Sequence, residues 1–203
     1  MTTDTNIPIE VVEVHIYADG ACSGNPGAGG YGVVILINGQ RQELSGGFRY
    51  TTNNRMEILG AIVGLKALNG LNGLHGQKRK VTIYSDSQYL VDMFNGGHAV
   101  KWRKDGWTRN KGKDQVKNPD LWNELLTVSA NHEVKMVWVK GHASNPHNSR
   151  CDELAVEARM RKDLPSDEGY INPQIPDVPE MNDVQAAQSS QALQEQTLFD
   201  WLR

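Results

Sequence analysis

VVEVHIYADGACSGNPGAGG, residues 11–30, is the stretch of sequence that decides the fold. Its first half alternates apolar residues, at positions 12, 14, 16 and 18, with more polar ones up to Asp19. This period of two predicts a half-buried β-strand that ends on the acid. Residues 19–30 are rich in glycine and predict a loop. The stretch therefore puts a carboxylate at the carboxyl end of a strand, where α/β sheets bind ligands.

Further strands and helices follow this stretch. Residues 31–37 and 40–50 predict antiparallel strands joined by the hairpin turn Asn38-Gly39. The later predicted elements are a helix opened by residues 51–57, a strand at 81–86, a helix capped by Ser87, a helix capped by Asn118 with Pro119 at its first position, a strand at 134–139 and a helix at 151–162. The order predicts an α/β fold with a five-stranded mixed sheet, three antiparallel strands and then two parallel ones, flanked by helices.

Four carboxylates are spread along these elements: Asp19, Glu57, Asp86 and Asp152. Asp19 and Asp86 end predicted strands, whereas Glu57 and Asp152 lie near predicted helix starts. Carboxylates gathered in one pocket repel one another unless a cation neutralises them. Mg²⁺ is the usual cation, and metal-assisted phosphoryl chemistry is its usual purpose. For Glu57 and Asp152 alone, a favourable interaction with the helix dipole is the alternative.

The composition is that of an ordinary globular protein, with 203 residues of which 38% are hydrophobic and 22% charged. No apolar run approaches the about 20 residues that a membrane helix needs. The first six residues lack the features of a secretory signal. The two cysteines, Cys22 and Cys151, fit a reducing compartment better than a disulfide framework. We therefore expect a cytoplasmic protein that does not contact a membrane.

Charge and composition divide the chain into segments. The net charge is −3, yet residues 98–117 hold seven Lys and Arg against two Asp, a local net charge of +5. Residues 164–193 are rich in Pro and Gln and contain neither Lys nor Arg. We expect a flexible N-terminus at 1–10, a catalytic domain at 11–163 with a basic handle at 98–117, a flexible linker at 164–193 and a separate peptide at 194–203.

Several blocks of the sequence resemble one known family. They are Ala18-Asp-Gly-Ala-Cys-Ser-Gly-Asn-Pro-Gly27, Thr51-Thr-Asn-Asn-Arg-Met-Glu57, Ser85-Asp-Ser-Gln88, Lys140-Gly-His-Ala143 and Cys151-Asp-Glu-Leu-Ala155. Together with the handle they span about residues 12–160 and resemble bacterial-type ribonuclease HI. The resemblance implies the ribonuclease H-like fold and a monomeric endonuclease. Such an enzyme hydrolyses the RNA strand of RNA–DNA hybrids, leaving 3′-OH and 5′-phosphate ends, in primer or R-loop removal.

The resemblance also implies a catalytic machinery. The four acids match the family's metal-binding residues, with two Mg²⁺ expected and Mn²⁺ as a substitute. Two metal ions can activate the attacking water and stabilise the departing oxygen. Asp19, on the central strand, is the expected bridging ligand. His142 matches the family's mobile histidine and can transfer protons near neutral pH, with His147 in the same loop as its rival.

Short polar side chains match the family's substrate contacts. Those expected in the minor groove, where the 2′-hydroxyl distinguishes RNA from DNA, are Asn25, Asn53, Asn54 and Gln88, together with the backbone from Cys22 to Asn25. Thr52 and Asn118 match positions that hold a phosphate of the DNA strand. The alternative for Asn53 and Asn54 is that they are only helix caps.

The handle combines basic residues with Trp102 and Trp107. This combination fits neutralisation of the DNA backbone and contact with its sugars, with Trp102 as the expected contact. The alternative is a solvated helix face whose tryptophans pack inward. We expect at least one of the two in the core, together with Trp122 and Trp138.

Two features depart from the family pattern. Ser149 stands where many members carry a Glu, so a carboxylate close to the last acid is missing. The tail beyond residue 194 resembles a sliding-clamp binding peptide, with Leu198, Phe199 and Trp201 as the expected contacts. A tail that folds back on the domain or binds another partner is the alternative.

Two competing functions are a DNA-cutting nuclease of the same fold and a catalytically weak hybrid-binding module. The amides and the handle argue against the first. The presence of all four acids argues against the second.

Overall fold

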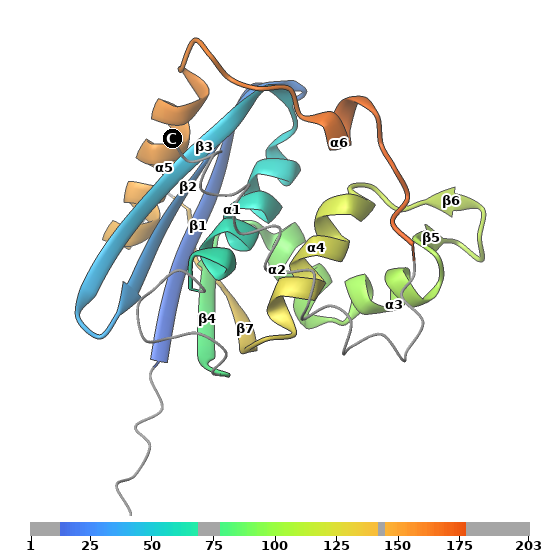
Figure 1. The fold of residues 1–203 in the computed structure, drawn as a ribbon, viewed down its shortest axis with the longest axis horizontal. Helices are drawn as coiled ribbons and strands as arrows, with labels where there is room; N and C mark the ends of the chain where they lie inside the picture. The colour runs from blue at the N-terminus through green and yellow to red at the C-terminus, as the bar shows by residue number, and fades with distance from the viewer. Residues whose placement is uncertain (1–12, 69–77, 142–144, 178–203) are drawn as a thin grey trace, which may run out of the picture.

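A five-stranded mixed sheet forms the centre of the molecule (Figure 1). The computed structural model describes residues 13–68, 78–141 and 145–177. The strands are β1 (Glu13–Gly24), β2 (Gly27–Ile37), β3 (Gln40–Thr51), β4 (Lys80–Ser85) and β7 (Glu133–Trp138), in the order β3-β2-β1-β4-β7. The first three are antiparallel neighbours, whereas β4 and β7 run parallel to β1. The predicted fold class is confirmed.

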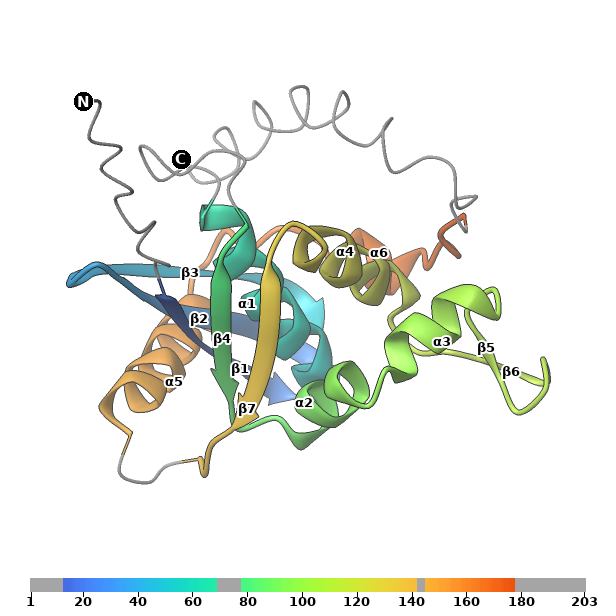
Figure 2. The same ribbon diagram turned by 90° about the horizontal axis from the view of Figure 1, so that it is seen from below.

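Helices cover both faces of the sheet. α1 (Asn53–Ala67) packs on one face of β1 and β2, with α4 (Pro119–Ser129) behind it, and α5 (Pro146–Arg159) lies on the other face (Figure 2). The remaining elements are α2 (Gln88–Asn95), α3 (His98–Lys104), the hairpin of β5 (Thr108–Arg109) and β6 (Asp114–Gln115), and α6 (Glu168–Ile171). Within the described residues, no helix combines the length and the apolar character needed to cross a membrane.

Small residues let the helices on both faces approach the sheet closely. A Cβ on Gly64 of α1 would lie 2.6 Å from Cγ2 of Ile16, and a Cβ on Gly32 of β2 would lie 2.0 Å from the carbonyl oxygen of Cys151 in α5. Both distances are far shorter than a van der Waals contact, so any larger residue would push the helix away. Gly32 pairs with Asp19 across the sheet. The close approach therefore brings α5 to the part of β1 that carries the first acid.

The glycine-rich residues after Asp19 form paired strand, and their prediction as a loop is wrong. β1 continues to Gly24, β2 begins at Gly27, and the two strands pair along this whole length. Backbone pairing in the hairpin outweighs the low strand propensity of glycine. Asp19 therefore lies within β1. However, the pairing of β1 with β4 stops at Tyr17 and Tyr84, so Asp19 still lies beyond the end of its parallel neighbour.

Two acids lie further inside their helices than the sequence predicts. α5 begins at Pro146 rather than at Cys151, and α1 begins at Asn53. Glu57 and Asp152 are consequently in the second turns of α1 and α5. The helix dipole acts mainly on the first turn. The alternative explanation of these two acids as dipole partners therefore loses its basis.

The first part of the predicted flexible linker packs on the domain, which corrects that prediction. The Arg49 amide donates to the carbonyl of Pro165 at 2.9 Å, and Thr51 Oγ1 donates to Asp167 at 2.6 Å. Asp167 is only 2% exposed and caps α6. Proline-rich composition does not reveal such specific contacts. The predicted linker from residue 178 on, the N-terminus at 1–10 and the peptide at 194–203 lie outside the described residues.

Candidate active site

Asp19 is a buried carboxyl at the centre of the site, with 7% of its surface exposed. Its Oδ1 accepts a hydrogen bond from the Gly20 amide at 2.7 Å. Burial, followed by repulsion from Asp86, Asp152 and Glu57, raises its pKa to about 8 in spite of the lowering effect of the Gly20 hydrogen bond. The raised pKa indicates that the three other acids, which come from three other parts of the chain, lie close to Asp19.

Glu57 is held by a hydrogen bond on each carboxylate oxygen. Asn53 Nδ2, one turn earlier in α1, donates to Oε1 at 2.7 Å. The Ser87 hydroxyl, which also caps α2, donates to Oε2. Glu57 is 9% exposed, and burial followed by repulsion from Asp86 raises its pKa to about 7 in spite of these donors. The two donors fix the direction of the carboxylate, and the sequence did not reveal this role of Ser87.

Asp86 follows the end of β4, as predicted. Its backbone carbonyl accepts a hydrogen bond from Trp138 Nε1 at 3.0 Å. A Cβ on Gly141 would lie 2.4 Å from Asp86 Oδ2, so a larger residue there would displace this carboxylate. Trp138 is 45% exposed, which makes its predicted place in the core wrong. Its ring supports the strand end that carries the acid instead.

Asp152 reaches the site on α5. The preceding residue, Cys151, is buried against β1, with its thiol donating to the carbonyl of Tyr17 at 3.2 Å. Burial is the main cause that raises the pKa of this thiol well above its usual range, so it stays protonated. Cys151 therefore anchors α5 on the strand that holds Asp19. Asp152, next in the helix, adds to the repulsion that raises the pKa of Asp19.

The four carboxylates form one electrostatic unit. In the part of the chain that the structure describes, no three of the His, Cys, Asp and Glu side chains are arranged as a finished set of metal ligands. Burial and the like charges of the neighbouring acids both raise the cost of ionising these carboxylates. Oxygen donors of this kind, oriented by neighbouring amides and hydroxyls, suit a hard divalent cation. The donor set therefore fits the predicted metal.

The two predicted histidines fare differently. His142 lies outside the described residues, directly after Gly141. The His147 ring packs 4.8 Å from that of Tyr17, and its Nδ1 lies 3.0 Å from Arg41 Nη1. Burial and the Arg41 charge lower the pKa of His147. None of its described contacts involves the four acids, so the structure gives no support to the rival histidine.

Two of the residues expected in the minor groove are linked to Glu57 by hydrogen bonds. Asn25 lies between β1 and β2, and its Oδ1 accepts a hydrogen bond from the backbone N–H of Asn53 at 3.2 Å. Asn53 in turn holds Glu57, so this chain of bonds links the turn to the acids. The N-cap of α1 is Thr52, without a side-chain capping bond, and the Asn residues are the first two helical positions. The alternative that they serve as caps is therefore wrong.

Cys22 and Gln88 flank this group. The Cys22 carbonyl accepts a hydrogen bond from Arg159 Nη1 at 2.9 Å, which connects β1 to α5. Burial raises the pKa of the half-buried Cys22 thiol to about 11, so the thiol stays neutral. Gln88 is exposed at the start of α2, directly after the serine that holds Glu57. Both residues therefore lie on segments that also carry or support the acids.

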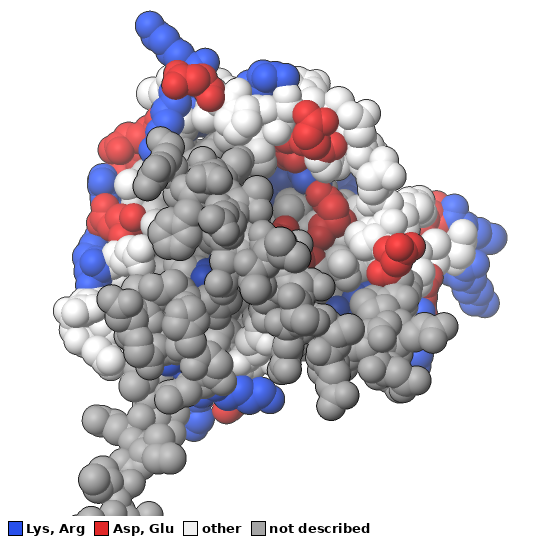
Figure 3. Space-filling view, viewed as in Figure 1, with Lys and Arg blue, Asp and Glu red and all other residues white. Residues whose placement is uncertain are grey.

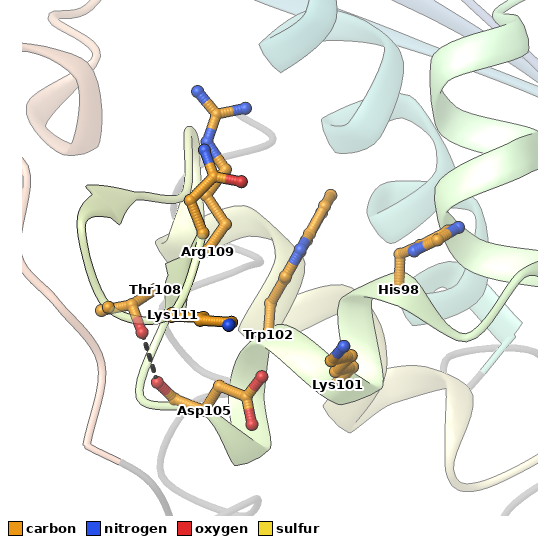
Figure 4. Close-up of a pocket in the computed structure, with 9 residues that line it drawn as sticks. His98, Lys101, Trp102, Asp105, Thr108, Arg109 and Lys111 are labelled. Atoms are coloured by element: carbon orange, nitrogen blue, oxygen red, sulfur yellow. Dashed lines mark hydrogen bonds between the residues drawn. The ribbon is translucent and has the colours of Figure 1, made fainter.

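The handle projects from the domain as α3 and the β5–β6 hairpin, and Lys and Arg side chains gather at this end (Figure 3). It contains a cavity of about 550 Å³, in which the Trp102 ring stands between His98 and Arg109 (Figure 4). Trp102 is half-buried, with its ring 5.9 Å from that of Trp122. Trp107 is fully buried, so one handle tryptophan packs inward as expected.

The two residues expected to hold a phosphate lie at helix starts. Thr52 is the N-cap of α1, and Asn118 is the N-cap of α4. Asn118 has a left-handed backbone with φ of 57° and makes no side-chain capping bond. The position of the cap and of Pro119 after it was predicted correctly, but its bonding was not. Helix N-termini favour anions, which suits both positions to a phosphate.

Comparisons of the sequence with a family model and with known proteins all point to the same family. The family model described as RNase H matches residues 12–160. Ribonuclease H of Rippkaea orientalis (strain PCC 8801 / RF-1) is 56% identical over 160 residues, covering 79% of this chain and 93% of that protein. Ribonuclease HI of Synechocystis sp. (strain ATCC 27184 / PCC 6803 / Kazusa) is 50% identical over 158 residues, covering 77% and 94%.

Solved structures agree with the sequence comparisons. The crystal structure of LC9-RNase H1, a type 1 RNase H with the type 2 active-site motif, superposes with a TM-score of 0.63 at 31% identity, covering 74% of each chain. LC11-RNase H1, solved in complex with RNA/DNA hybrid, gives a TM-score of 0.56 at 25% identity, covering 71% of this chain and 95% of that one. From the match of the family model and the identity to these relatives, the chain belongs to the RNase H family.

Proposed function

We propose that this protein is an endonuclease that hydrolyses the RNA strand of RNA–DNA hybrids and leaves 3′-OH and 5′-phosphate ends. The observation that carries the proposal is the electrostatic unit of four carboxylates, drawn from β1, α1, the end of β4 and α5. Its relatives are named ribonuclease H, and LC11-RNase H1 was solved with RNA/DNA hybrid. We propose that the enzyme acts as a monomer in the cytoplasm, where it removes RNA primers or R-loops.

Asp19, Glu57, Asp86 and Asp152 would hold the metal. Mg²⁺, as two ions and with Mn²⁺ as a substitute, would activate water and stabilise the charge on the departing 3′-oxygen. The Asp19 carboxyl is repelled by each of the other three acids, which supports its role as the bridging ligand. Asn53 and Ser87 keep the Glu57 carboxylate in one orientation, so it need not reorganise when substrate arrives.

The other residues bind the hybrid and move protons. His142, next to the glycine that lies against Asp86, would transfer a proton to the leaving oxygen. Asn25, Asn53, Asn54 and Gln88, with the backbone near Cys22, would contact the 2′-hydroxyls of the RNA strand. Thr52 and Asn118 would hold a DNA phosphate, and the handle with Trp102 would contact the DNA backbone.

The tail would give the enzyme a second partner. Leu198, Phe199 and Trp201 lie outside the described residues, and their pattern in the sequence supports docking to a sliding clamp. A tethered peptide of this kind raises the local concentration of the enzyme at its site of action.

Cleavage of a hybrid with end-labelled RNA tests the proposal. Wild type with Mg²⁺ should cut internal RNA positions of the hybrid, and should leave duplex DNA of the same sequence intact. EDTA, or the substitution Asp19→Asn, should abolish cleavage while hybrid binding is retained. Binding without cleavage by wild type would indicate a hybrid-binding module. Cleavage of duplex DNA would indicate a DNA nuclease of the same fold.

A further inference from the structure

A second buried charged cluster lies away from the four acids and is built around Arg55. The guanidinium donates to both carboxylate oxygens of Asp167, at 2.7 and 2.8 Å, and to both of Asp120, at 2.9 and 2.6 Å. Thr51 Oγ1 also donates to Asp167, at 2.6 Å. Arg55 and Asp167 are each 2% exposed. We name these four residues, Thr51, Arg55, Asp120 and Asp167, the Arg55 bridge.

The Arg55 bridge joins three segments that are far apart in the sequence. Thr51 and Arg55 enclose the junction of β3 and α1, Asp120 is in the first turn of α4, and Asp167 caps α6. α6 lies across the starts of α1 and α4 in the ribbon diagram (Figure 1). A Cβ on Gly169 of α6 would lie 2.1 Å from Asp120 Oδ2, so the segment is fitted closely to the bridge.

The geometry of the bridge fixes the relative position of the two helix starts. A planar guanidinium that binds two carboxylates with paired hydrogen bonds sets both the distance and the angle between them. Thr52 lies between Thr51 and Arg55, and Asn118 lies two residues before Asp120. Both proposed phosphate contacts are therefore within two residues of the bridge in the sequence, although they come from different helices.

We propose that the Arg55 bridge positions Thr52 and Asn118 as a single phosphate-holding unit for the DNA strand, and that Asp167 is a positioning residue for substrate binding. This inference rests on the proposed function, which assigns the phosphate to Thr52 and Asn118. The C-terminal segment at 165–171 is then part of the substrate-binding apparatus, although it touches no substrate. Loss of the Asp167 charge releases α6 and one side of the guanidinium, so the orientation of Arg55 and of the Asp120 carboxylate that joins α4 to α1 is no longer fixed.

The test measures KM and kcat for hybrid cleavage by the full chain. Asp167→Asn keeps the shape of the side chain and removes its charge. Thr51→Val is a milder variant that removes one donor to the same carboxylate. Both are compared with Glu168→Gln, an exposed neighbour in α6 outside the bridge. Thermal unfolding first establishes a temperature at which every variant is fully folded.

We expect Asp167→Asn to raise KM about tenfold, Thr51→Val to raise it less, and Glu168→Gln to leave it unchanged, with kcat unchanged in all three. In a double-mutant cycle, Asp167→Asn should add little to the effect of Thr52→Ala, because both disturb the same phosphate contact. A hybrid with single methylphosphonate linkages in the DNA strand supplies a direct probe. Wild type should lose affinity at one linkage, and Asp167→Asn should be insensitive to it.

The outcomes separate the inference from the function on which it rests. If Thr52→Ala raises KM but Asp167→Asn lowers only thermal stability, the bridge is purely stabilising and the inference is overturned. Full additivity in the cycle also overturns it. If Thr52→Ala and the methylphosphonates leave KM unchanged while wild type still cleaves hybrids, the assignment of the phosphate fails, and the inference fails with it.

Discussion

The four-acid site and the Arg55 bridge are two buried charged clusters built in opposite ways. In the site, burial and like charges raise the pKa of Asp19 to about 8 and that of Glu57 to about 7. In the bridge, one guanidinium is matched to two carboxylates, with hydrogen bonds to each. The comparison shows that like charges gather in the four-acid site, where a cation can bind, whereas opposite charges in the Arg55 bridge are matched and fix the protein's own structure.

Loss of the central acid should give the largest effect, a loss of activity without a loss of stability. Asp19→Asn is expected to lower kcat for hybrid cleavage by about 10³-fold or more, because it removes a group that acts as part of one catalytic unit. The same substitution should raise the free energy of unfolding of the metal-free protein at pH 7 by on the order of 2 kcal/mol, since an amide avoids the cost of a buried, repelled carboxyl. Single-turnover cleavage and urea unfolding in EDTA measure the two effects. A variant that is both inactive and less stable would contradict this prediction.

Loss of the central cation of the bridge should instead lower the free energy of unfolding. Arg55→Leu leaves two carboxylates without their partner, and we expect it to cost about 3–5 kcal/mol in the free energy of unfolding. Arg161→Leu, at an exposed arginine that bonds Ser45, is the control and should cost less than about 1 kcal/mol. Urea unfolding of both variants provides the measurement. Equal losses for the two would show that the bridge contributes no more than a surface contact.

The pH dependence of stability should distinguish the two clusters. The folded-state pKa of Asp19 lies above the ordinary value of 3.8 for this group, so the folded protein binds the proton more tightly than the unfolded chain. This contribution to stability is present below pH 4 and is lost as the pH rises to about 8, by up to about 1.4 kcal/mol per pH unit. Asp19→Asn should remove that part of the slope in metal-free protein, as followed by unfolding at a series of pH values. An unchanged slope would contradict the raised pKa.

The smallest effect is expected at the residue that orients Glu57. Ser87→Ala removes a donor to the Glu57 carboxylate and the cap of α2. We expect about a tenfold loss in kcat and about 1 kcal/mol less stability. Asp167→Asn, which acts on KM instead, is the natural comparison in the same cleavage assay. A normal kcat for Ser87→Ala would mean that Asn53 alone suffices to hold Glu57.

Local chemistry explains which parts of the molecule were predictable. The alternation up to Asp19, the Asn38-Gly39 turn and the Ser87 cap depend on neighbouring residues, and all three are present in the structure. The glycines after Asp19 misled the prediction, because their strand conformation depends on pairing with β2. Sequence spacing cannot show pairing partners of this kind.

Long-range side-chain contacts account for what the sequence did not reveal. Arg55 belongs to the motif at residues 51–57, but its partners lie 65 and 112 residues away in the sequence. Trp138 was expected in the core as an apolar residue on a strand, whereas its indole donates to the backbone of Asp86 at the sheet edge. The four acids were predictable as a set only because they share one chemistry. The contacts of the residues that orient these acids become visible only in the folded structure.

The most direct measurement is an NMR titration of the Asp19 carboxyl in metal-free protein and in protein saturated with Mg²⁺. Without metal, we expect this group to titrate near pH 8. With Mg²⁺ bound, its midpoint should fall well below neutrality, because the cation stabilises the charged form. Asp120 in the Arg55 bridge should show no response to the metal. An Asp19 that titrates near pH 4 without metal, or a midpoint that Mg²⁺ does not move, would contradict the claim that the four acids form a cation site.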